Sequence, residues 1–126
     1  MQKPNHRVIS GRLQSFAHAF RGCATLLVTQ PNARIHAAAS ATICVLGATL
    51  GLKVGEWLWI VVAIAMVWSA EAFNTALEFL ADAVNPDYHP LVGKAKDVAA
   101  AAVLIAALGA AVIGLLVLGP YFTRLL

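Results

Sequence analysis

Long apolar stretches alternate with short polar ones along most of the chain. The first, residues 35–52, would form a helix of roughly 27 Å, close to the roughly 30 Å thickness of a bilayer's hydrocarbon core. A second apolar stretch begins at Trp57 and continues into a polar tail, and a third covers residues 98–118. The pattern predicts membrane helices at 35–52, 57–84 and 98–118, the second extending into the cytoplasm.

Residues 8–30, before the first span, have a different pattern. Apolar residues such as Leu13, Phe16 and Phe20 recur at three- and four-residue steps, with Arg12 and Arg21 among the polar residues between them. This spacing is typical of an amphipathic helix. Because its polar face is cationic, we expect this helix to lie in the interface of an anionic bilayer.

The composition supports a membrane protein. Hydrophobic residues make up 60% of the 126 residues and charged residues only 12%, whereas about a quarter of the residues in a soluble protein are charged. We therefore expect residues 1–126 to form one all-α membrane domain, and we expect no nucleic-acid partner.

The basic residues predict the orientation. Of nine Lys and Arg residues, five precede the first span and two lie between the second and third spans, which leaves two, Lys53 and Arg124, on the other side. Cytoplasmic loops carry the excess of Lys and Arg. The N-terminus and the connection between the second and third spans should therefore be cytoplasmic.

A polar stripe begins where the second span leaves its apolar part. Glu71, Asn74, Glu78 and Asp82 fall within an arc of roughly 80° on a helix. Glu71 follows an almost wholly apolar stretch, and an acid at the hydrocarbon boundary is a functional candidate by default. The alternative is that Glu78 and Asp82 are merely the solvated end of a long helix.

Cations and an acid, Lys94, Lys96 and Asp97, precede the third span. Such a combination can bind a metal-bound polyphosphate, because carboxylates hold Mg²⁺ and lysines neutralise phosphate charge. The alternative is that the lysines meet anionic lipid headgroups. The chain contains no GxxxxGK[ST] motif, so a P-loop would not hold the phosphates.

The histidines have no spacing that suggests a metal site. His18 and His36 are read as interfacial packing residues and His89 as a loop cap.

These motifs carry a family resemblance. "EAFNTALE" with Asp82, "YHP" at 88–90 and "AKDVAAAAVL" from residue 95 resemble the signature of the prokaryotic diacylglycerol kinase family, small integral membrane lipid kinases. "FAHAFRG" and "NARIH" upstream are similar to the undecaprenol-kinase branch of that family.

The resemblance implies a homotrimer of three-span subunits, each with a surface helix, in the bacterial inner membrane. It implies ATP as the phosphoryl donor, Mg²⁺ as cofactor and a lipid alcohol as acceptor, with undecaprenol favoured over diacylglycerol. By the same resemblance, Glu71 is the general base, Glu78 a metal ligand and Asn74 a contact near the phosphates. The remaining nucleotide-binding candidates are Asp87, Tyr88, His89, Lys96, Asp97, His18 and Arg12.

One position departs from the family pattern. Gln30 stands where the family usually has a second metal-binding glutamate. Its amide oxygen can ligate Mg²⁺ but carries no charge, so we expect weaker metal binding or help from Asp82.

Two other functions fit parts of the pattern. A small transporter would also carry an acid within an Ala- and Gly-rich membrane domain. A non-catalytic assembly subunit would use its small residues, such as Gly109 and Gly114, for close helix packing.

Overall fold

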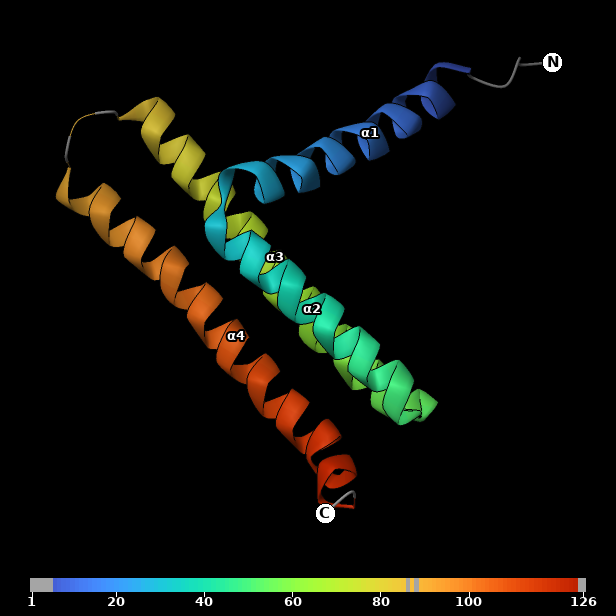
Figure 1. The fold of residues 1–126 in the computed structure, drawn as a ribbon. Helices are drawn as coiled ribbons and strands as arrows, with labels where there is room; N and C mark the ends of the chain where they lie inside the picture. The colour runs from blue at the N-terminus through green and yellow to red at the C-terminus, as the bar shows by residue number, and fades with distance from the viewer. Residues whose placement is uncertain (1–5, 86, 88, 125–126) are drawn as a thin grey trace.

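A computed structural model describes residues 6–85, 87 and 89–124, and within these residues every regular element is a helix. The four helices are α1 (His6–Thr29), α2 (Pro31–Leu50), α3 (Val54–Val84) and α4 (Pro90–Thr123). In Figure 1, α2, α3 and α4 run alongside one another, whereas α1 departs to the side. The last three helices are long and apolar enough to cross a membrane, so the expected all-α membrane protein is confirmed.

Helix α2 is bounded by residues with special backbone chemistry. Pro31 opens it at the first helical position, where the missing N–H costs nothing. Gly51 closes it in the left-handed conformation at φ 71°, and the N–H of Leu52 donates to the carbonyl of Gly47 at 3.0 Å. This glycine cap turns the chain sharply, so α3 runs back antiparallel to α2.

The end of the bundle that contains the α2–α3 connection and the C-terminus is tightly tied, and we call it the packed end. Glu56 Oε2 accepts hydrogen bonds from Lys53 N at 2.7 Å and from Tyr121 Oη at 2.5 Å. An apolar cluster centred on Leu52, Ile60 and Leu118 lies beside these bonds. The start of α3 is thereby fastened to the last turns of α4.

Helix α4 begins earlier than the predicted span. It starts at Pro90 with His89 as its N-cap, and the His89 side chain accepts from Leu91 N. Lys94, Lys96 and Asp97 therefore lie on the first turns of a helix that extends beyond the predicted 98–118. The packing of α4 against α3 therefore sets the distance between these three residues and α3.

Many large apolar side chains on the three long helices face outward. Val61, Leu104 and Leu115, for example, are each more than half exposed in the single chain. A soluble monomer rarely exposes so many large apolar side chains together. In this chain they are suited to contact lipid or neighbouring copies.

Helix α1 is confirmed as a helix, and its aromatic residues Phe16 and Phe20 are exposed. The sequence-based expectation that it lies in the membrane interface stays a prediction.

Candidate active site

A cavity of about 310 Å³ lies between α2, α3 and α4, in the half of the bundle nearer the α3–α4 connection. We call it the polar cavity and this half the polar end. Its walls on the α4 side are small and apolar, with Ala100, Val103 and Ala107 among them. The polar side chains that line it are Asn32, His36, Glu71, Asn74 and Glu78.

Glu71 is the most deeply buried of these side chains. It is 1% exposed, and its Oε2 has no hydrogen-bond partner among the described residues. A buried polar atom without a partner costs about 1–3 kcal/mol, and buried carboxylates are normally paired. The polar cavity therefore contains an acceptor that no described residue satisfies.

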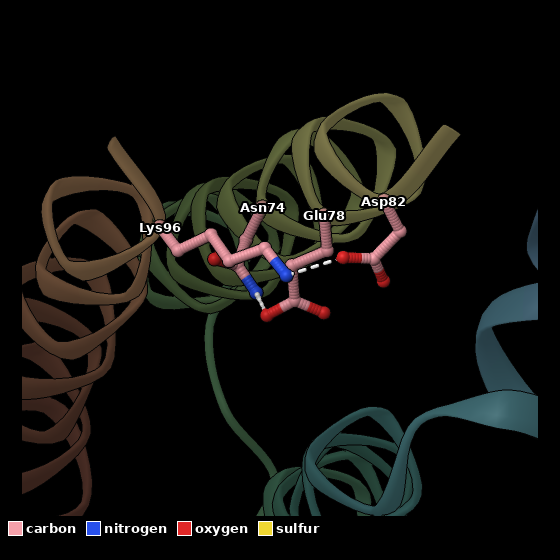
Figure 2. Close-up of polar contacts among 4 residues, drawn as sticks. All are labelled: Asn74, Glu78, Asp82 and Lys96. Carbon is pink, nitrogen blue, oxygen red and sulfur yellow. Dashed lines mark hydrogen bonds and ion pairs between the residues drawn. The ribbon is translucent and has the colours of Figure 1, made fainter. Parts of the chain in front are cut away.

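Asn74 lies one turn from Glu71 and also lines the cavity. Its Nδ2 donates to Glu78 Oε1 at 3.2 Å (Figure 2), while its Oδ1 is buried without a partner in the described structure. The donor side of the amide is thus used to orient Glu78. The acceptor side has no donor among the described residues.

Across the bundle, Lys96 on α4 reaches the end of the polar stripe. Its Nζ lies 2.5 Å from Asp82 Oδ1, and both side chains remain accessible to solvent (Figure 2). The expected opposition of a cation on the third span to the acidic stripe on the second is thus observed. At an exposed site such a pair contributes about 0–1 kcal/mol, so it orients Lys96 more than it stabilises the fold.

The other candidates near the α3–α4 connection lie outside the polar cavity. Asp87 and Asp97 are exposed. His89 is exposed too, and its Nδ1 accepts from Leu91 N at 3.2 Å, which agrees with the loop-cap interpretation. Tyr88 lies outside the described residues.

The N-terminal candidates also do not line the polar cavity of the single chain. Arg12 and His18 are exposed on α1. Gln30 sits between α1 and α2 as the N-cap residue of α2, half-buried and without a side-chain capping bond. None of the three lines the cavity. Gln30 and Glu78 therefore do not line one cavity in the single chain.

No cluster of three or more His, Cys, Asp or Glu side chains occurs within the described part of the chain. The oxygen atoms best placed for a hard cation are the Glu78 carboxylate and the unpaired Asn74 Oδ1. Both are ligand types that Mg²⁺ accepts, and Mg²⁺ usually keeps several waters and substrate phosphates in its shell.

Three polar residues at this end had no site role predicted from the sequence. Asn32 and His36 lie four residues apart on α2, a spacing that places both on one helix face, and both line the cavity. Thr75 is 2% exposed and its hydroxyl is also unpaired among the described residues. The signal for Thr75 was its position four residues after Glu71, and the signal for the α2 pair was the same spacing.

The sequence is similar to those of known membrane lipid kinases. The family profile described as prokaryotic diacylglycerol kinase matches residues 17–118. Undecaprenol kinase of Bacillus subtilis is 37% identical over 121 residues, which cover 95% of this chain and 98% of that protein. Diacylglycerol kinase of Synechocystis is 34% identical over 90% of this chain and 66% of its own length. Diacylglycerol kinase of Escherichia coli is 37% identical over 48% of this chain and 49% of its own length.

Proposed function

The chain belongs to the prokaryotic diacylglycerol kinase family and is a lipid kinase, and we propose that it phosphorylates the hydroxyl of undecaprenol with MgATP as donor. The observation that carries the proposal is the unpaired Glu71 Oε2, buried in a cavity that also holds Asn74 and Glu78. Diacylglycerol is the next candidate acceptor. The transporter and the assembly subunit are set aside because the family consists of lipid kinases.

The preference for undecaprenol is supported by the comparisons. The relative matched over nearly its full length is an undecaprenol kinase, whereas the Escherichia coli diacylglycerol kinase matches over about half of this chain. The apolar walls of the membrane domain would suit a prenyl chain and an acyl chain alike. The residues around the lipid's hydroxyl must therefore distinguish undecaprenol from diacylglycerol.

Glu71 acts as the general base in this proposal. Its Oε2 accepts the proton of the lipid hydroxyl while the hydroxyl oxygen forms a bond to the γ-phosphorus of ATP. The bond from that phosphorus to the β,γ-bridging oxygen breaks, and ADP leaves with the electron pair. Because phosphoryl transfer requires little covalent chemistry from the protein, positioning and charge neutralisation supply most of the rate.

The distance between Glu71 and Glu78 along α3 is suited to a site that binds a lipid on one side and a nucleotide on the other. Glu71 and Glu78 are seven residues apart, which is roughly 10 Å along a helix axis. Glu71 is buried and would lie at the depth of a lipid hydroxyl, whereas Glu78 is half-exposed and would lie nearer the aqueous side. A lipid and a water-soluble nucleotide can therefore approach the same stripe from opposite directions.

Mg²⁺ fits the donor set at the outer part of the stripe. Glu78 and Asn74 Oδ1 would hold it, with Gln30 as a further ligand if the assembly brings it near. The bound ion would supply neutralisation of phosphate charge. Lys96 and Asp97 would contact the nucleotide, and the family resemblance adds Asp87, Tyr88, His89, His18 and Arg12 as residues around it.

A homotrimer with shared sites is part of the proposal. Arg12, His18 and Gln30 do not line the polar cavity of their own chain, and α1 departs from the bundle (Figure 1). Exposed apolar side chains along α2–α4 offer surface for neighbouring copies. An α1 helix that reached a neighbour's cavity would bring these candidates to an active site.

The proposed location is the bacterial inner membrane, with the N-terminus and the α3–α4 connection in the cytoplasm. The basic residues support this orientation, and it places the polar end where ATP is available. Helix α1 would lie on the same membrane surface.

Transfer of labelled phosphate from ATP to purified lipid tests the function. The protein, in mixed micelles, is given undecaprenol or diacylglycerol at matched mole fractions, and the phosphorylated lipid is separated and counted. We expect faster labelling of undecaprenol. Higher kcat/KM for diacylglycerol would overturn the acceptor assignment, and absence of label in both lipids would overturn the proposed function.

A further inference from the structure

A second cavity adjoins the polar cavity. It has a volume of about 580 Å³, and most of its lining residues are apolar side chains of α2, α3 and α4, such as Ile43, Val67 and Leu115. We call it the apolar cavity. Two residues, His36 and Ala107, line both cavities. The junction between a polar space and an apolar space is therefore marked by one imidazole and one methyl group.

His36 is directed into this junction by its place on α2. Asn32, His36 and Ser40 follow one another at four-residue steps, so they share one helix face. Asn32 lines only the polar cavity and Ser40 only the apolar one, where its Oγ accepts from Trp68 Nε1 at 3.2 Å. His36 is half-buried and makes no hydrogen bond to another described residue. Its ring N–H is thus available to a ligand.

Around the polar cavity, buried hydrogen-bond acceptors outnumber the donors that reach them. Glu71 Oε2 and Asn74 Oδ1 are buried acceptors without donors in the described structure. A neutral imidazole offers one N–H donor, and an alcohol offers one O–H donor with two acceptor lone pairs. An alcohol at the junction could donate to Glu71, accept from His36, and keep its second lone pair for the phosphorus.

The geometry points to His36 as the residue that binds the acceptor's hydroxyl oxygen. This inference rests on the proposed function. The imidazole holds the alcohol at the boundary between the two cavities, with the hydroxyl toward Glu71 and the hydrocarbon chain leading into the apolar cavity. The substrate class that this arrangement selects is a long-chain alcohol whose first carbons are slim enough to pass His36 and Ala107.

The test compares steady-state constants of three variants in the same micelles. His36→Leu keeps the bulk but removes the donor, whereas His36→Gln keeps a hydrogen-bonding group. Thr42→Val on the same helix is the matched control, because Thr42 is exposed, lines neither cavity and donates only to the Ala38 carbonyl. Loss of one hydrogen bond corresponds to about a 3- to 10-fold change in an equilibrium constant.

We expect His36→Leu to raise the KM for the lipid alcohol by that factor while the KM for ATP stays within twofold of the original. His36→Gln should recover part of the loss, and Thr42→Val should change neither constant. An unchanged lipid KM in His36→Leu overturns the inference. An equal rise in both KM values, or a lowered thermal midpoint that accounts for the loss, overturns it as well.

A second readout does not depend on catalysis. The imidazole signals of the ¹⁵N-histidine-labelled protein are recorded while farnesol, a short prenyl alcohol, is added without ATP, and the His36 signal is identified by its absence in His36→Gln. We expect farnesol to shift the His36 signal, and an unshifted signal overturns the inference. If the protein labels no lipid but the signal shifts, the proposed function fails while the alcohol site stands.

Discussion

The two ends of the helical bundle treat polar side chains in opposite ways. At the packed end, Glu56 Oε2 has two donors, Lys53 N and Tyr121 Oη. At the polar end, Glu71 Oε2, Asn74 Oδ1 and Thr75 Oγ1 are buried without any partner in the described structure. The packed end uses these polar groups to fasten helices together, whereas the polar end leaves three buried polar atoms unpaired within the described residues.

We expect this contrast to separate polar residues that stabilise the fold from polar residues that serve activity. A satisfied carboxylate adds to the stability of the folded state, whereas an unsatisfied buried one lowers it by about 1–3 kcal/mol. A chain can retain such a cost when a ligand supplies the missing partner. Substitutions at the polar end should therefore affect activity, and substitutions at the packed end should affect stability.

The largest expected effect is the loss of activity in Glu71→Gln. The amide has almost the same shape but cannot accept the proton of the lipid hydroxyl, so kcat should fall by about 10²- to 10⁴-fold. The thermal midpoint in detergent should stay the same or rise, because an unpaired buried carboxylate is removed. Phosphate transfer and thermal unfolding, measured on one preparation, check both parts.

Glu56→Gln is the control from the other end. Its hydrogen bonds to Lys53 N and Tyr121 Oη should weaken, so the thermal midpoint should fall while kcat is retained. If Glu71→Gln loses stability and Glu56→Gln loses activity instead, the division between the two ends is wrong.

The next effect is on packing at the packed end. A Cβ at Gly47 would lie 2.8 Å from Cη2 of Trp57, closer than two carbon atoms can approach. Gly47→Val should therefore destabilise the fold by about 1–3 kcal/mol through overpacking. Gly55→Val, where nothing lies within 4 Å, serves as control. Equal thermal midpoints for the two variants would show that Trp57 moves freely.

A smaller effect is expected for Gln30→Glu. If an assembled enzyme brings this position to the metal, the added charge should raise activity several-fold at limiting Mg²⁺ and leave it unchanged at saturation. Titration of activity against Mg²⁺ in both forms gives the answer. Identical metal dependence would show that residue 30 is not at the metal.

The smallest effect is expected for Asp82→Asn. The variant removes the partner of an exposed lysine, so the free energy of unfolding should change by at most about 1 kcal/mol. Because Lys96 then loses the carboxylate that orients it, the KM for ATP is a more sensitive measurement than stability. This KM should rise modestly at low ionic strength. A large loss of stability would mean that this pair is structural after all.

Much of the fold could be predicted from the sequence because it depends on local periodicity. The apolar stretches identified three long helices, and the positions of Glu71, Asn74, Glu78 and Asp82 on one face followed from the helical repeat alone. The start of α4 at Pro90 was not predicted. The polar residues of its first turns were taken for a connection, although Pro90 is suited to the first position of a helix.

Only the α3 part of the polar cavity at the candidate site could be predicted from the sequence. The residues of α3 could be found because an acid at the end of an apolar stretch is conspicuous. Asn32 and His36 drew attention only as parts of the family-like "NARIH" segment, and His36 was interpreted as a packing residue, since a single histidine in a membrane helix has no partner within its own segment. Their relation to Glu71 exists only across the space between helices.

The sequence by itself determined that this chain forms membrane helices with a polar stripe on one of them, because hydrophobic length and helical period are properties of adjacent residues. Only the tertiary structure decided which polar atoms find partners. That outcome depends on how three helices pack: it pairs Glu56 with Tyr121, sets Lys96 beside Asp82, and leaves Glu71 facing a cavity that His36 shares.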